Sequence, residues 1–183
     1  DACMKNIFRP TVDAMLKENR KFKGCLYFGL MLTPEGPKVI EYNCRFGDPE
    51  TQVVLPLLKT DLVDIFEAVI NENLDQIDIQ WDNCACACVV MASGGYPVKY
   101  QSGYPIEGLD SRGQAVGCKV YHAGTKFEDD RFVTAGGRVL GVTSTAPTLQ
   151  EALDKSYNAV SVIHFKDAHY RKDIGKRALS VLK

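Results

Sequence analysis

Residues 39–50, with the sequence VIEYNCRFGDPE, carry the densest series of chemically capable side chains in the chain. Successive side chains of a strand face opposite ways, so Glu41, Asn43 and Arg45 are predicted to share one face. Carboxylate and amide oxygens suit Mg²⁺ or Mn²⁺, which takes few protein carboxylates and completes its coordination with water and substrate phosphates. Arg45 adds a planar fork suited to phosphate or carboxylate. The residues alone leave two interpretations open, a metal and phosphate site or a strand end that merely exposes charged residues.

The same segment predicts an opposite face and the start of a helix. Ile40, Tyr42 and Cys44 alternate with the polar residues and are expected to lie together on the other face of the strand. After Phe46 the chain reads as a turn into a helix, with Asp48 as the N-cap and Pro49 at the first helical position. A strand that ends in a helix start would hold its last polar side chains at one edge of the fold.

Composition limits the classes of function. The 183 residues suffice for one ordinary domain or two small ones, and the net charge of −1 indicates neither a nucleic-acid nor a membrane-binding patch. The longest wholly apolar run, residues 85–92, is too short to cross a bilayer, and the start at Asp1 does not resemble a signal peptide. The abrupt start into an amphipathic segment suggests a piece of a longer protein.

The seven cysteines need a separate explanation. Cys84, Cys86 and Cys88 alternate with alanines, so a strand would place their sulfurs on one face. The chain offers neither a Cys-x-x-Cys pair nor nearby histidines, which a metal site of this kind would require. We therefore predict that these are small buried apolar side chains, and such use of free cysteine favours a reducing cytoplasm.

Hydrophobic periodicity predicts an α+β fold in which helices and antiparallel strands are mixed along the chain. Polar residues 71–83 read as a connection, with a domain boundary near Trp81. Hairpin turns are expected at residues 34–37, between the first two strands, and at residues 135–137. The expected helices cover residues 4–16 and 175–182 and begin at Pro49, Asp61 and Thr148, with Asp61 and Thr148 as N-caps. The expected strands cover residues 24–32, 39–43, 84–91, 116–122, 131–134 and 138–144.

The remaining candidate sites favour structural roles. Two Gly-Gly pairs, at residues 94–95 and 136–137, lack the order of strand, glycine loop and helix that binds phosphate, so turns are predicted. The charged group around Arg171 and Asp173 is predicted to be solvated surface or a clasp for the tail. The three histidines lack metal-ligand spacing and are predicted to be structural: His122, His164 and His169.

Residues 39–52 closely resemble the phosphoribosylamine–glycine ligase family, also called glycinamide ribonucleotide synthetase. The run RFGDPE is the specific part of the motif, whereas a Glu-x-Asn strand alone indicates only the wider ATP-grasp superfamily. The likeness covers essentially the whole chain. Further matching segments are residues 23–31, 94–97, 122–125, 136–140 and 171–175.

The resemblance implies a domain organisation. Residues 1–80 would form the C-terminal portion of an ATP-grasp domain with the metal motif, and residues 81–183 a small β-rich C-terminal domain with a helix. The N-terminal half of the enzyme would be missing, together with its phosphate-binding lysines, mobile lid and phosphoribosyl site. This leaves open whether the isolated chain is active.

The resemblance also implies an activity. In this family ATP phosphorylates the carboxylate of glycine, and the amine of 5-phosphoribosylamine attacks the glycyl phosphate in an early step of purine synthesis. By residue-for-residue similarity, Glu41 and Asn43 would hold Mg²⁺ or Mn²⁺ and Arg45 would stabilise phosphoryl charge. Asp48 would contact substrate, and Ile40 would form an apolar wall for adenine.

One departure from the wider superfamily stands out. Many ATP-grasp enzymes supply a further acidic metal ligand from the preceding strand, whereas residues 24–32 contain no carboxylate. Either the site uses fewer protein ligands or the missing half supplies one. Two alternatives to the ligase therefore remain, another ATP-grasp carboxylate–amine ligase and a noncatalytic scaffold fragment.

Overall fold

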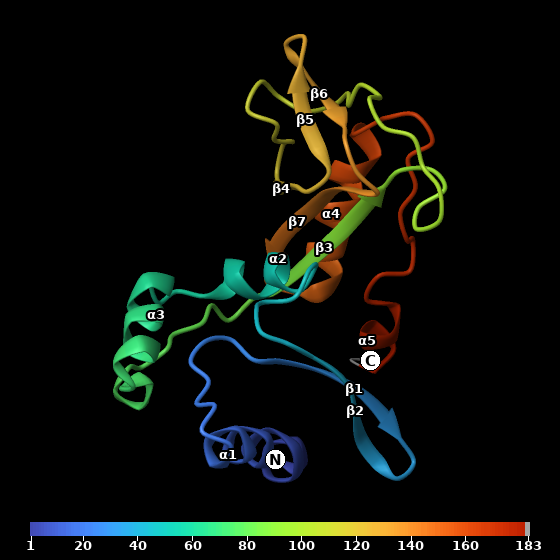
Figure 1. The fold of residues 1–183 in the computed structure, drawn as a ribbon. Helices are drawn as coiled ribbons and strands as arrows, with labels where there is room; N and C mark the ends of the chain where they lie inside the picture. Colours follow the sequence, from blue (N-terminus) through green and yellow to red (C-terminus); the bar gives the residue numbers. More distant parts are fainter. Residues whose placement is uncertain (182–183) are drawn as a thin grey trace. The chain divides into compact units, whose positions relative to one another are not determined.

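The computed structural model describes residues 1–181 and confirms an α+β fold (Figure 1). The chain separates into two compact units. The first consists of residues 1–48 and 59–80, and the second of residues 49–58 and the chain from Trp81 onward. Because the short segment 49–58 belongs to the second unit, the chain leaves the first unit and returns to it before residue 81. Each unit is described by itself below.

The first unit begins with the predicted amphipathic helix. A π-helical turn, Met4–Phe8, runs without a break into α1, Arg9–Lys17, so Pro10, which has no N–H to donate, lies inside a continuous helical segment. The two-stranded sheet that follows pairs β1, Tyr27–Thr33, with β2, Gly36–Asn43, in an antiparallel hairpin with its turn at Pro34 and Glu35. The helix over residues 4–16 and the hairpin were both predicted, and both are confirmed.

Aromatic side chains connect this helix to one face of the hairpin. The rings of Phe8 and Phe28 have centroids 4.4 Å apart, and the rings of Phe28 and Tyr42 have centroids 5.3 Å apart in an edge-on arrangement. Tyr42 and Phe28 are directly opposite each other in the strand register. The helix therefore packs against the face of the hairpin that carries Tyr42.

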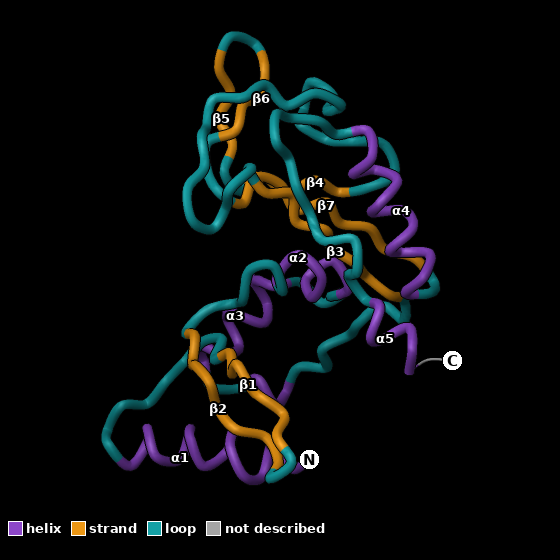
Figure 2. Tube along the Cα trace, turned by 90° about the vertical axis from the view of Figure 1, so that its right-hand side faces the viewer, coloured by secondary structure: helices purple, strands orange, loops and turns teal. Residues whose placement is uncertain are grey.

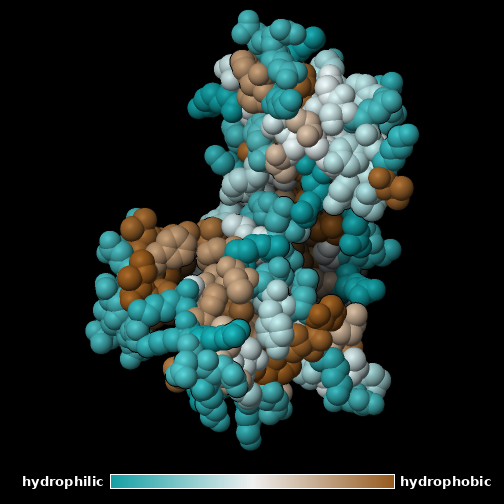
Figure 3. All heavy atoms as spheres, viewed as in Figure 1, coloured by the Kyte–Doolittle hydropathy of each residue, from teal (hydrophilic) through white to brown (hydrophobic). Residues whose placement is uncertain are grey.

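Helix α3, Leu62–Asn71, completes the first unit together with a short 3-10 turn, Leu74–Gln76. Asp61 is its N-cap, as predicted, and accepts a 2.8 Å hydrogen bond from the backbone N–H of Val63. One face of α3 is apolar and exposed, which Figure 3 shows as a hydrophobic patch over this helix. The exposed apolar side chains on that face are Val63, Phe66 and Ile70.

An ion-pair clasp joins the C-terminus of α3 to the segment before β1. Glu72, in a left-handed conformation at φ 60°, is hydrogen-bonded to Lys21 and lies 2.8 Å from the Nζ atom of Lys23. The same Nζ atom donates a 2.7 Å hydrogen bond to the carbonyl oxygen of Ile70. A cation is favourable here because the carbonyls at a helix C-terminus carry partial negative charge.

We expect Glu72 to titrate far below an ordinary glutamate. Hydrogen bonds from Lys21 and then Lys23 lower the pKa of Glu72 to about 2. Since the folded-state pKa lies below the unfolded value of about 4.3, the contribution of the clasp to stability is fully present above that value and is lost as the pH falls through about 2. NMR titration of the Glu72 carboxyl carbon measures this directly. In a Lys21→Met variant the midpoint should rise, and a midpoint near 4 in the unmodified chain would contradict the clasp.

The second unit is built on a three-stranded antiparallel sheet in the order β3-β7-β4. Strand β3 covers Ala85–Ala92, β7 covers Arg138–Ala146, and β4 covers Lys119–His122. Helix α4, Leu149–Val162, lies along this sheet and packs on β3 and β7 (Figure 2). Its Ser156 hydroxyl is fully buried and donates a 3.1 Å hydrogen bond to the carbonyl of Ala87.

The core of this unit lies between the sheet and α4. Valine, leucine and isoleucine dominate it, as expected for β-strands with one face covered by a helix. The most deeply buried apolar side chains of this core are Val89, Met91, Val120, Val139, Leu140, Val142, Val160 and Ile163. Thr148 is the N-cap of α4, as predicted, and accepts a 3.3 Å hydrogen bond from the N–H of Glu151.

Smaller elements complete the second unit. Helix α2, Thr51–Val54, continues into a 3-10 turn, Leu55–Leu57. Strands β5, Thr125–Glu128, and β6, Arg131–Thr134, form a separate two-stranded sheet, and α5 covers Lys176–Val181. The predicted C-terminal helix is confirmed over these residues, while its predicted last residue, Leu182, lies outside the described residues.

Two predictions of local structure are wrong. The turn at residues 135–137 does not join a hairpin, because β6 pairs with β5 through a turn at Asp129 and Asp130, while β7 pairs with β3 and β4. Asp48 is not an N-cap: α2 begins at Thr51, after a turn over residues 48–50, and Glu50 holds the N-cap position without a side-chain cap. In both places a turn is present where it was predicted. The prediction was wrong about the strand that pairs next in the first case and about where the helix begins in the second.

Candidate functional site

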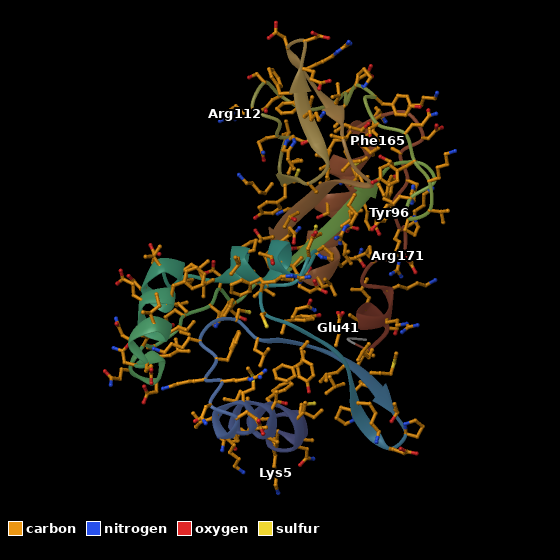
Figure 4. The ribbon with its side chains drawn as sticks, viewed as in Figure 1. Lys5, Glu41, Tyr96, Arg112, Phe165 and Arg171 are labelled. Atoms are coloured by element: carbon orange, nitrogen blue, oxygen red, sulfur yellow. The ribbon has the colours of Figure 1, made fainter. Side chains whose placement is uncertain are left out.

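The side chains predicted to do chemistry lie on β2 and the segment directly after it. Glu41 and Asn43 are on β2, where they pair with Gly29 and Tyr27 of β1, and Glu41 is labelled in Figure 4. Glu41 is exposed and Asn43 is half-buried. The two residues are separated by one position of an extended strand, so they share a face, as predicted. The structure thus presents a carboxylate and an amide side by side on an accessible strand.

A β-bulge interrupts the alternation of β2 at Ile40. Glu41 pairs with Gly29, but Val39 pairs with Leu30, so Ile40 is the extra residue of the bulge and has no partner in the register. A bulge re-aims the side chains next to it. The simple alternation predicted for Ile40, Tyr42 and Cys44 is thus interrupted, because Val39 and not Ile40 pairs across the hairpin with Leu30.

The opposite face of the hairpin forms one wall of an apolar groove of about 650 Å³. Helix α1 and the π-helical turn before it form the other wall. Val39, Tyr42 and Cys44 line the groove on the hairpin side, and Ile40, Glu41 and Asn43 are not among its lining residues. Alternation along β2 thus separates an apolar face, which packs on the helix, from the face that carries Glu41 and Asn43.

Arg45 and Asp48 continue the same segment beyond the strand. Both side chains are exposed, and the Nη1 atom of Arg45 donates a 3.1 Å hydrogen bond to the carbonyl oxygen of Phe46. That bond uses one of the five N–H donors of the guanidinium, so donors remain for an anion. Glu41, Asn43, Arg45 and Asp48 all belong to the first unit.

The donor set fits a magnesium-type ion that arrives with a phosphate ligand. Within residues 1–181, no group of three or more His, Cys, Asp or Glu side chains is placed to hold a metal ion. Glu41 offers a carboxylate and Asn43 an amide oxygen, which are too few for an all-protein site. Mg²⁺ characteristically uses one or two carboxylates and fills its remaining positions with water and substrate phosphates.

The three cysteines of the β3 region do not form a nucleophilic or metal site. Cys88 is buried, and Cys84 and Cys86 are half-buried. Burial, with the neighbouring thiols of Cys88 and Cys84 as smaller causes, raises the pKa of Cys86 to about 11. A thiol in this environment is protonated at neutral pH and therefore unreactive. The prediction of buried side chains is confirmed for Cys88, whereas Cys84 and Cys86 are only half-buried.

We expect alkylation to discriminate between the cysteines. Cys44 is exposed, whereas Cys86 is half-buried with a raised pKa. At pH 7.5, iodoacetamide should modify Cys44 at least about 10-fold faster than Cys86, since only the thiolate reacts. Peptide mass spectrometry over a time course provides the rates. Equal rates in the folded protein would contradict the burial of Cys86.

The other candidates have structural partners. The Nδ1 atom of His122 lies 2.9 Å from the Thr125 hydroxyl, and its Nε2 atom lies 2.8 Å from the carbonyl oxygen of Gly113. Arg171 forms a two-bond pair with Asp173, at 3.0 Å and 2.9 Å, on the surface of the second unit. These contacts agree with the predicted structural roles of the histidine and of the charged tail.

Gly29 belongs to this site but was not predicted from the sequence. A Cβ atom on Gly29 would lie 2.7 Å from the Cγ atom of Glu41. A glycine inside a strand often marks a close approach by a neighbouring group, and this was the available signal. The register across the hairpin was needed to identify Glu41 as that group.

Comparison with known protein families identifies the origin of this arrangement. The model for the C domain of phosphoribosylglycinamide synthetase matches residues 86–177, about half of the chain, and the model for the ATP-grasp (A) domain of the same enzyme matches residues 1–51. The chain belongs to the phosphoribosylglycinamide synthetase family. The ATP-grasp match ends just past the segment that contains Glu41, Asn43, Arg45 and Asp48.

Individual relatives of the phosphoribosylglycinamide synthetase family agree. A phosphoribosylamine–glycine ligase of Caldanaerobacter subterraneus is 47% identical over 170 residues, which cover 93% of this chain and 40% of the relative. The trifunctional purine biosynthetic protein adenosine-3 of Gallus gallus is 49% identical over 179 residues, covering 97% of this chain and 18% of the relative. The chain thus spans about two fifths of the single-function relative and a smaller share of the trifunctional one.

A solved structure supports the same fold. The crystal structure of phosphoribosylamine–glycine ligase from Thermotoga maritima superposes with a TM-score of 0.81 at 32% identity and covers 93% of this chain and 41% of that chain. The family match therefore extends from sequence to backbone.

Within the part of the chain that the structure describes, no helix is long and apolar enough to span a membrane.

Proposed function

We propose that this chain is part of an ATP-dependent ligase that joins glycine to 5-phosphoribosylamine in purine biosynthesis. The observation that carries the proposal is the 47% identity to a phosphoribosylamine–glycine ligase across 93% of the chain. In the proposed reaction the glycine carboxylate takes the γ-phosphoryl group of ATP, which leaves ADP and glycyl phosphate. The amine of phosphoribosylamine then attacks the acyl carbon, phosphate leaves, and the amide of glycinamide ribonucleotide forms.

Glu41 and Asn43 are the proposed metal ligands. Their shared exposed face on β2 and their hard oxygen atoms suit Mg²⁺ or Mn²⁺ bound together with ATP. Such an ion would neutralise charge on the phosphate oxygens as the phosphoryl group moves. Because no carboxylate occurs in residues 24–32, Glu41 would be the single charged metal ligand contributed by this hairpin.

Three neighbouring residues complete the proposed site. Arg45 would donate hydrogen bonds to the phosphoryl oxygens, since its guanidinium is exposed and charged. Asp48 would contact a substrate. Ile40, which is 62% exposed and has no partner in the strand register, would offer an apolar contact to adenine.

The complete ligase would include residues that this chain does not contain. Lysines that bind phosphate, a lid and the phosphoribosyl site are proposed to come from an N-terminal part, since the single-function relative is aligned over only 40% of its length. Residues 1–80 and 81–183 are proposed as the end of the ATP-grasp domain and the small C-terminal domain. We also propose that the enzyme works in the cytoplasm, in keeping with its unpaired cysteines.

Substrate dependence in the complete ligase tests this function. ADP release should require glycine and phosphoribosylamine together at steady state, and mass spectrometry should detect one glycinamide ribonucleotide for each ADP. Alanine and other small carboxylates serve as matched alternative substrates and should support much slower release. ADP release that is faster with another carboxylate, or without an amide product, would point to a different ATP-grasp ligase.

A further inference from the structure

Glu41 lies across the backbone of Gly29 in the β1–β2 hairpin. The two residues are direct partners in the antiparallel register. A Cβ atom built on Gly29 would be 2.7 Å from the Cγ atom of Glu41, 3.5 Å from its Cδ atom and 3.4 Å from its Oε1 atom. The first of these distances is well inside van der Waals contact, so the Glu41 side chain occupies space that any other residue at position 29 would fill.

The backbone of Gly29 does not itself require glycine. Gly29 does not have a positive φ angle, whereas Gly36 in the same hairpin has a φ of 102°. An alanine could therefore adopt the backbone conformation of position 29 without strain. What glycine provides at this position is space, and Glu41 is the group that uses it.

The β-bulge begins at the same place. The register shifts between Gly29 and Leu30, where Ile40 is the extra residue on β2. On one side of Glu41 the chain is therefore irregular, and on the other Asn43 continues the regular pairing with Tyr27. Glu41 is thus the last residue of the regular pairing before the bulge, and its side chain is in contact with the partner strand at Gly29.

We propose that Gly29 is a positioning residue for the metal-binding carboxylate of Glu41. This inference rests on the proposed function of Glu41. By having no side chain, Gly29 lets Glu41 fold over β1, which holds its carboxylate close to the sheet on the face shared with Asn43. A methyl group at position 29 would rotate the Glu41 side chain away and misdirect the carboxylate while the backbone stays in place. Gly29 itself contacts neither metal nor substrate.

Mn²⁺ binding in the presence of ADP tests this role in the complete ligase, by electron paramagnetic resonance of free Mn²⁺. Gly29→Ala should weaken Mn²⁺ binding by about 10- to 100-fold, as is typical when a group that orients a metal ligand is changed. Glu41→Gln should weaken it as well. In the Glu41→Gln background, Gly29→Ala should cause no additional loss, because the misdirected carboxylate is already absent.

Gly36→Ala is the matched control. It lies in the same hairpin and strains the backbone at φ 102°, but a Cβ atom there would meet nothing within 4 Å. Its Mn²⁺ affinity should equal that of the unmodified ligase. An equal loss from Gly36→Ala would show that hairpin strain is the cause and would overturn the inference.

Two results separate the inference from the proposed function. If Glu41→Gln leaves Mn²⁺ affinity unchanged, the metal site and the inference both fail. If Glu41→Gln weakens binding and Gly29→Ala does not, or if Gly29→Ala weakens it equally in both backgrounds, only the inference fails.

If Gly29→Ala folds poorly, the melting temperatures of the variants provide a second test. Removing the side chain beyond Cβ with Glu41→Ala also removes the atom that the new methyl group would meet. Gly29→Ala should therefore lower the melting temperature of the unmodified ligase but not that of the Glu41→Ala variant. An equal decrease in both backgrounds would overturn the inference.

Discussion

Replacing Glu41 by glutamine is expected to reduce glycine-dependent ADP formation by the complete ligase about 100-fold or more. Glutamine keeps the shape of the side chain on β2 but removes the one carboxylate of the paired strands β1 and β2. Loss of a group that merely supports a metal ligand costs about 10- to 100-fold, so loss of the ligand's charge should reach at least the upper end. Initial rates at saturating ATP, glycine and phosphoribosylamine provide the measurement.

Glu35→Gln is the control for this change. Glu35 is also an exposed glutamate of the same hairpin, and it lies at the turn, where its carboxylate is 3.4 Å from the Nζ atom of Lys38. A surface pair of this kind contributes little, so turnover should stay within about twofold of the unmodified ligase. Unchanged turnover in Glu41→Gln, or equal losses in both variants, would remove Glu41 from the metal site.

The second large effect concerns stability. Leu140 is completely buried on β7, the central strand of the three-stranded sheet of the second unit, where it pairs with Met91 and His122. Leu140→Ala should lower the free energy of unfolding by about 2–5 kcal/mol, because it removes buried methyl groups and leaves a cavity between the sheet and α4. Urea denaturation followed by circular dichroism measures the change.

Val116→Ala provides the comparison in the same unit. The Val116 side chain is 99% exposed, so its truncation should change the free energy of unfolding by no more than about 0.5 kcal/mol. A similar loss in both variants would mean that β7 is not at the centre of the core. A loss below about 1 kcal/mol in Leu140→Ala would mean the same.

Local signals in the sequence were sufficient wherever the structure depends on neighbouring residues. Asp61 and Thr148 were predicted as N-caps because a short oxygen-bearing side chain preceded an apolar helical pattern, and both accept the expected hydrogen bond. The β1–β2 hairpin was likewise predicted from a local signal, two apolar runs on either side of a turn that contains Pro34 and Gly36. Such features involve residues within a few positions of one another.

Features that depend on distant pairing were not predictable from one sequence. Strand β7 follows β6 after three residues and could have formed a hairpin with it, but it pairs with β3 and β4 instead. Burial of the longer apolar strand in the central position of the sheet outweighs the local turn. Asp48 likewise looked like a cap, yet the chain makes another turn before α2 begins at Thr51.

The candidate site was predicted in part. The alternation of Glu41 and Asn43 along an extended strand follows from residue types and spacing alone, and their pairing with β1 agrees with it. The bulge at Ile40 and the space above Gly29 could not be predicted, since both arise from the register of two strands. The roles of Glu41, Asn43, Arg45 and Asp48 stay predictions, as does the division of the chain at residue 80.

A crystal structure of the complete ligase with Mn²⁺ and a nonhydrolysable ATP analogue tests the central claim most directly. Anomalous scattering identifies the ion without reference to its ligands. We expect a metal position at which the Glu41 carboxylate and the Asn43 amide oxygen both coordinate at roughly 2.0–2.2 Å, with phosphate oxygens completing the shell. A metal bound to the nucleotide without contact to Glu41 or Asn43 would contradict the account.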